Sequence, residues 1–194
     1  MSPILQTFGD STLRAFGFTR GSAGGAGAMT LISTQVLAST ATTVTFSSIP
    51  QTYKHLQLRY TARADTGFNV LALLNFNGDS GTNYASHGVY GSGSGMTSFN
   101  TTSATRITTN YGFIPGASND ANAFAGVVTD ILDYTNTSKN KTVRMLHGNY
   151  VSNSPTVSLI SGVWLSTSAI TSLVLSTNTG NYVAGSRFSL YGVL

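Results

Sequence analysis

Asn75, Asn77 and Asp79 alternate in the stretch NFNGDSG, the spacing of the oxygen ligands that open a calcium-binding loop. The glutamate that closes such a loop would have to stand at position 86, where this chain has Ser86. Asn-Gly is also a strong signal for a tight turn between two strands. The stretch is therefore predicted to be a hairpin turn rather than a metal site.

Asp130 and Asp133 could act as the paired carboxylates of a glycoside hydrolase. Residues three apart on a strand project to opposite faces of the sheet, however, so this spacing does not favour a shared catalytic site. The whole chain has only six acidic residues and no glutamate. A polysaccharide depolymerase is therefore a weak alternative.

The three histidines, His55, His87 and His147, stand in different segments, without an H-x-x-x-H or nucleophile-elbow pattern. A Ser-His-Asp set needs its members to meet only in space, and a serine-rich chain supplies many chance candidates. We therefore predict no catalytic residue, no metal ligand and no cofactor, and expect that the protein is not an enzyme.

Basic and aromatic residues also have limited chemistry here. The densest basic group is SKNK at 138–141 with Arg144, which reads as a solvated hairpin tip because no aromatic residues are interleaved to stack bases. The net charge of +4 comes from scattered residues, so nucleic-acid binding is not expected. Trp164 and Tyr191 are predicted to be core residues, although an aromatic at the rim could stack on a sugar ring.

The elements that position these residues are predicted to be strands. In 54–64, Leu56, Leu58 and Tyr60 alternate with polar residues, the cleanest period of two in the chain. The segment 68–76 is almost wholly apolar, which indicates a strand covered on both faces, by its own chain or by a subunit partner. Further segments with strand-like patterns are 30–37, 42–48, 104–114, 126–134, 142–151, 156–166, 168–177 and 186–194.

Two segments are harder to assign. Residues 91–103 have no periodicity and are predicted to be a long exposed loop. Residues 118–134 fit either a capped helix or a loop followed by a strand. Gly126 and the branched residues Val127, Val128 and Ile131 favour the strand, starting at about 126.

Length and composition define the organisation of the chain. Its 194 residues suffice for one β domain, and the absence of cysteine excludes a disulfide-stapled domain. No secretory leader or membrane span is predicted, so synthesis in a cytoplasm without membrane insertion is expected. GSAGGAGA at 21–28 reads as a flexible linker. The prediction is an all-β, antiparallel, jelly-roll-like β-sandwich at 29–194, preceded by an extended arm at 1–20.

Several segments resemble a C-terminal β-sandwich domain of tailed-bacteriophage virion proteins. They are 49–65, 74–93, 130–150, 161–176 and 186–194. Such proteins are tail-fibre, decoration or minor structural proteins. The resemblance implies a homotrimer on a virion, assembled in the host cytoplasm and tethered by its arm. A short tail-fibre or baseplate appendage that contacts a host-surface glycan is the leading hypothesis, a capsid decoration protein is the alternative, and a free-standing lectin is less favoured.

The arm carries the predicted anchor. Leu13, Phe16 and Phe18 would bury apolar surface in another virion protein, and Arg14 and Arg20 would add charge-assisted contacts. So short a segment cannot bury these groups by itself, so we expect it to order only on binding. Host recognition is predicted in the polar loops 78–103 and 116–123.

Overall fold

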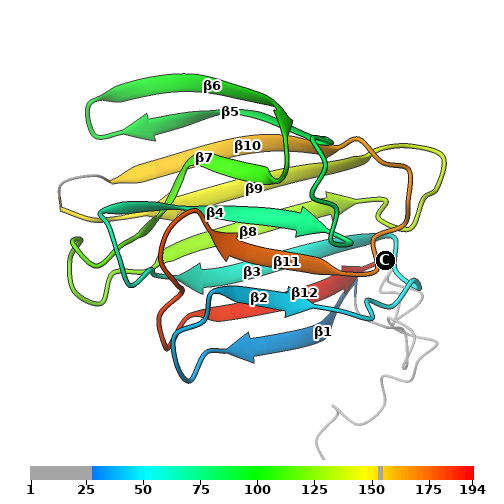
Figure 1. Ribbon diagram of the computed structural model, residues 1–194, viewed down its shortest axis with the longest axis horizontal. Coiled ribbons are helices and arrows are strands. Elements are labelled where there is room, and N and C mark those ends of the chain that lie inside the picture. Colours follow the sequence, from blue (N-terminus) through cyan, green and yellow to red (C-terminus); the bar gives the residue numbers. More distant parts are fainter. Residues whose placement is uncertain (1–27, 153–154) are drawn as a thin grey trace, which may run out of the picture.

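The computed structural model describes residues 28–152 and 155–194 (Figure 1). Every regular element in these ranges is a strand. The strands are β1 Met29–Val36, β2 Thr43–Phe46, β3 His55–Ala62, β4 Asn69–Phe76, β5 Tyr84–Ser92, β6 Gly95–Ala104, β7 Ile107–Pro115, β8 Ala125–Leu132, β9 Lys141–Asn149, β10 Thr156–Trp164, β11 Leu173–Thr177 and β12 Arg187–Val193. The predicted arm, 1–20, and most of the predicted linker lie outside the described residues.

The strands form two sheets that pack face to face. The larger has the order β1-β12-β3-β8-β9-β10-β5-β6 and the smaller the order β2-β11-β4-β7. All their pairings are antiparallel. Figure 1 views the two layers face on, with β1 and β6 at opposite edges of the larger sheet. The predicted antiparallel β-sandwich is confirmed.

Side-chain alternation explains how the sheets pack. Leu56, Leu58 and Tyr60 of β3 are buried between the sheets, whereas Arg59 and Thr61 face solvent, as the period of two predicts. The same rule governs β12 and β8, the two neighbours of β3 in the larger sheet, and β9 and β10 beyond β8. One face of that sheet therefore packs on the smaller sheet, and its other face, here called the outer face, does not.

The interior is not uniform along β5, β9 and β10. At one end, Trp164 of β10 packs on Tyr84 and Phe76, with ring centroids 6.3 and 5.7 Å away. At the other end, the inward residues are polar and include His147 and Thr156. Strand β7 covers this polar end, because it contacts β10, β5 and β9.

The ladder between β4 and β7 has an irregular middle. Leu71 pairs with Phe113 and Leu73 with Thr108. An advance of two residues on β4 therefore corresponds to an advance of five residues on β7. The extra residues make β7 bulge beside His147, and Gly112 permits this approach because a Cβ there would lie 3.2 Å from the His147 ring.

The segment 91–103 is not the exposed loop that its composition predicts. It continues β5, turns at 93–94 and forms most of β6. Strand β6 is an edge strand with most residues solvent-exposed, so its ladder with β5 holds it rather than an alternation of buried side chains. The strand predicted from about 126 is confirmed as β8, and no helix forms between 118 and 134.

Strand β4 confirms the apolar strand predicted at 68–76. Val70, Ala72, Leu74 and Phe76 face the larger sheet and are buried. On the opposite face Leu73 is also buried, whereas Leu71 is half-buried. This second face is thus covered in part by the same chain.

Candidate functional site

The outer face of the larger sheet is the broadest surface on which side chains from distant segments meet. Strand register places one polar residue from each of six neighbouring strands in a line, here called the polar row. Its members, in order from β3 to β6, are Gln57, Asp130, Arg144, Ser161, His87 and Asn100. Sequence separation hid this row, because its members come from strands that are adjacent only after folding.

Hydrogen bonds order one half of the polar row. Gln57 Nε2 donates to Asp130 Oδ1 at 2.8 Å, and Arg144 Nη2 donates to Asp130 Oδ2 at 3.1 Å. Gln57 Oε1 accepts from Arg59 Nε at 2.6 Å. Asp130 is therefore held between an amide and a guanidinium, which suits a surface network rather than a general acid or base.

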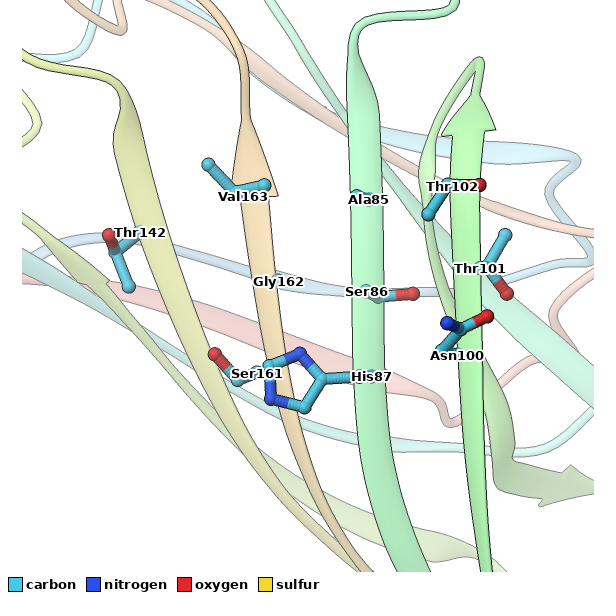
Figure 2. A pocket seen from close by; sticks show the side chains of 10 residues that line it. All are labelled: Ala85, Ser86, His87, Asn100, Thr101, Thr102, Thr142, Ser161, Gly162 and Val163. Atoms are coloured by element: carbon cyan, nitrogen blue, oxygen red, sulfur yellow. The ribbon is translucent and has the colours of Figure 1, made fainter.

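The other half of the polar row borders two hollows. Figure 2 shows the first, of about 360 Å³, with His87 pointing toward β10, where Ser161 lies. The second, of about 420 Å³, lies on the other side of His87 and includes Arg144 and Leu159. No carboxylate among the described residues lines either hollow, so Ser161 and His87 lack the acid that orients a catalytic histidine. The hollows offer hydroxyl, amide and imidazole groups for contact.

An apolar row runs beside the polar row. Val128, Leu146, Leu159 and Val89 lie in register on β8, β9, β10 and β5. Leu146, Leu159 and Val89 are 56%, 58% and 41% exposed. These side chains form a contiguous, partly exposed apolar strip on the outer face.

The third feature of the outer face is basic. A shallow groove of about 350 Å³ crosses β12, β3 and β8 and is lined by Arg187, Tyr191, Arg59 and Gly126, among others. The Arg59 guanidinium carbon lies 5.1 Å from the centre of the Tyr191 ring. Tyr191 is therefore on the outer face, and its prediction as a core residue is wrong, because Phe188 and Leu190 take the inward positions of β12.

The stretch with calcium-loop spacing, NFNGDSG at 75–81, forms a turn. Asn77 and Gly78 have φ values of 52° and 70°, and Asp79 N donates to Phe76 O at 2.9 Å. The hairpin prediction is wrong, however, because β4 and β5 belong to different sheets. Asp79 directs this crossing by accepting from Trp164 Nε1 at 2.6 Å.

That contact also accounts for the state of Asp79. The hydrogen bond from Trp164 lowers the pKa of the Asp79 carboxyl, and further bonds from Asn83 and the Gly81 amide lower it as well. The carboxylate thus acts as an internal acceptor. The Trp164 ring is buried, as predicted. No group of three residues suited to hold a metal occurs in the described part of the chain.

The remaining candidate residues lie apart from one another. Asp133 forms an ion pair with Lys139 and lies beside His55, at 3.5 Å, whereas Asp130 has separate partners. His147 is 1% exposed, so its side chain does not reach the surface. Sequence spacing does not bring these groups into one site.

Lys141 corrects the prediction of a solvated basic tip at 138–141. It is 0% exposed, and its Nζ donates to the carbonyl oxygens of Asn136, Lys139 and Thr167 at 2.6–3.0 Å. Burial lowers the pKa of its ammonium. The one sequence signal for this burial is alternation: Lys141 lies two residues before Val143, so on strand β9 it points to the same, inward face. Its hydrogen bonds join the loop before β9 to the loop that contains Thr167.

The loop 116–123 is fastened by Arg63. Its guanidinium donates to the carbonyl oxygens of Asp120, Ala123 and Asn119 at 2.7–3.2 Å. Asp120 in turn accepts from Ser152. Recognition by this loop stays a prediction, and the segment 78–103 contributes strands to the outer face in place of a free loop.

Comparison with protein-family models, curated proteins and solved structures found no match to this chain. The resemblance to tailed-bacteriophage virion proteins therefore stays a prediction that rests on the sequence segments alone. Across residues 28–152 and 155–194 there is no helix long and apolar enough to cross a bilayer.

Proposed function

We propose that this protein is a non-enzymatic structural protein of a tailed-bacteriophage virion, a short tail-fibre or baseplate-attached appendage. The observation that carries the proposal is the outer face, on which no described strand packs, with its apolar row, of which Leu146, Leu159 and Val89 are exposed. A broad, slightly hydrophobic sheet face suits contact with another large surface, whereas a small-molecule enzyme needs an enclosed pocket with converging polar groups.

The apolar row supports self-association into the homotrimer that the sequence resemblance implies. Burial of a wholly exposed aliphatic side chain is worth about 1.5–3 kcal/mol, so covering the exposed halves of Leu146 and Leu159 contributes roughly 1 kcal/mol each. We expect that the double variant L146S/L159S keeps the far-UV circular dichroism spectrum of the wild type but shifts the light-scattering mass toward the monomer. T97S/T101S on β6 is a control. A wild-type monomer at micromolar concentration would contradict the trimer.

The start of the described chain supports attachment through the arm. Strand β1 is the edge of the larger sheet, and Ala28 lies beside the last residue, where its carbonyl accepts from Leu194 N. Ala28 thus stands next to an edge strand of the sheet rather than in the interior. Leu13, Phe16 and Phe18, with Arg14 and Arg20, are the proposed contacts of this arm with another virion protein.

Particles that carry the protein test the virion assignment and the position on the particle. Antibodies to residues 29–194 should label the tail or baseplate of intact particles, and deletion of 1–20 should remove the label while the purified domain keeps its melting temperature. Label on the head would favour the capsid-decoration alternative. If the protein is absent from purified particles, or if the truncated chain assembles at normal copy number, the virion or the anchor proposal respectively is wrong.

A further inference from the structure

We propose that the basic groove on the outer face binds an acidic polysaccharide, one whose sugars carry carboxylate groups. The groove crosses β12, β3 and β8, in the half of the outer face away from β5 and β6. Its outward side chains are Arg187, Ser189, Tyr191, Arg59, Thr61 and Val128. This inference depends on the groove alone and holds whether or not the protein belongs to a virion.

The positive charge of the groove favours an anionic ligand. Among the described residues neither Arg59 nor Arg187 pairs with a carboxylate: Arg59 donates to Gln57 and to the Met29 sulfur, a weak acceptor. The nearest acid in the register, Asp130, is already shared by Gln57 and Arg144. The groove therefore presents two guanidinium groups that an anionic ligand can neutralise.

The acidic side chains in the described part of a second copy are poorly suited to supply that anion. Five of the six acidic residues lie in the described part, and each one is already held by partners of its own chain. These residues are Asp65, Asp79, Asp120, Asp130 and Asp133. Among residues 28–152 and 155–194, no acidic side chain is therefore left without a partner to supply the complementary charge.

Geometry favours a saccharide over an acidic peptide. Extended peptides bind sheets through the free backbone groups of an edge strand, but β3, β8 and β12 are interior strands whose backbones pair on both sides. A saccharide needs no such pairing and can use the exposed hydroxyl of Thr61 together with the guanidinium groups, whereas Ser189 is buried. Ser189 is itself positioned by Thr34, whose Oγ1 lies 2.5 Å from Ser189 Oγ.

The floor of the groove is open because it lacks a side chain. Gly126 lies in register with Thr61 on β3 and Gly148 on β9, and a Cβ at position 126 or 148 would meet no atom within 4 Å. The held position of Arg59 over the Tyr191 ring lowers the entropy lost on binding. A pyranose ring can thus lie on the backbone of β8 at Gly126, beside Thr61 and diagonally across from Arg59.

Calorimetric titration with hexagalacturonate tests the groove, and its fully methyl-esterified, neutral form is the matched control ligand. We expect saturable binding of the acid, none of the ester, and weaker binding at higher salt. R59Q and R187Q should each weaken binding about tenfold, since each removes a charge-assisted contact. G126Q should block the floor, whereas G95Q, at an equally open glycine that begins β6, should bind as the wild type does.

Equal binding of the ester, or full binding by G126Q, would overturn the proposal. Tighter binding of a hexaglutamate peptide that is lost in R59Q and R187Q would overturn it in favour of an acidic protein partner. Far-UV circular dichroism of each variant separates loss of the site from loss of the fold. A protein absent from virions that still binds hexagalacturonate would refute the proposed function and leave this inference standing.

Discussion

The two ends of the interior along β5, β9 and β10 follow different rules. At the Trp164 end, buried polar atoms have partners: the indole N–H reaches Asp79, the Tyr84 hydroxyl contacts Phe76, and Lys141 reaches three carbonyls. At the His147 end, both imidazole nitrogens and the Thr156 hydroxyl are buried and have no hydrogen bond of ordinary geometry within the described part of the chain. The comparison suggests that stability is concentrated at the first end, because an unpartnered buried polar atom is costly.

Replacement of Trp164 by alanine should have the largest effect. The variant loses the packing on Phe76 and Tyr84 and removes the donor to Asp79. We expect the free energy of unfolding to fall by about 3–5 kcal/mol, as for other large buried aromatics. Urea unfolding followed by far-UV circular dichroism measures it. Leu165→Ala, at the exposed neighbouring position, is the control, and a comparable loss there would break the comparison.

At the His147 end of the interior, we expect the free energy of unfolding to depend on pH. Burial lowers the pKa of His147 to about 4 from an ordinary 6.5, only partly offset by the Phe113 backbone. In the unfolded chain His147 is therefore protonated below pH 6.5, whereas in the folded chain it becomes protonated only near pH 4. The stabilisation is complete above pH 6.5 and is lost as the pH falls toward 4, by about 3 kcal/mol in total.

Urea midpoints at several pH values from 7 to 4 test this expectation. His147→Met introduces a side chain of similar size that does not titrate. The variant should therefore flatten the pH dependence of the urea midpoint in that window. Carboxyls with a lowered pKa, such as Asp79 and Asp133, lose their contribution only at lower pH, below their ordinary pKa of 3.8. An unchanged slope in the variant would show that His147 does not titrate in this way.

The smallest expected effect compares two buried threonines. The Thr109 hydroxyl donates to Ala72 O at 3.1 Å, whereas that of Thr156 has no hydrogen-bond partner among residues 28–152 and 155–194. Thr109→Val should lower the free energy of unfolding by about 1 kcal/mol, whereas Thr156→Val should leave it unchanged or raise it by a similar amount. Equal losses in thermal unfolding would show that Thr156 is satisfied, by water for example.

Local patterns predict parts of this structure well. The alternation of Leu56, Leu58 and Tyr60 gives the correct inward face of β3, and branched residues correctly favour strand β8 over a helix. Strand β6 escapes prediction because its backbone ladder, and not an apolar pattern, holds it at the edge.

The candidate site is less predictable for a physical reason. Gln57, Asp130 and Arg144 meet because β3, β8 and β9 are neighbours, and strand order depends on pairings between distant segments. Lys141 is buried because carbonyls from two loops converge on it, which no local spacing encodes. The sequence alone does show the scarcity of acidic residues on which the inference about a polyanion partly rests.

The bulge of β7 over His147 has a consequence for local opening. Strand β7 is the edge of the smaller sheet, and its ladder with β4 is interrupted between the pairs of Thr108 and Phe113. Lifting this strand exposes polar groups that water can solvate, so the opening costs less than it would above the aromatic cluster. We therefore expect backbone amides of β7 to exchange with deuterium sooner than those of β3 or β8, which makes this edge the first part of the sandwich to admit solvent.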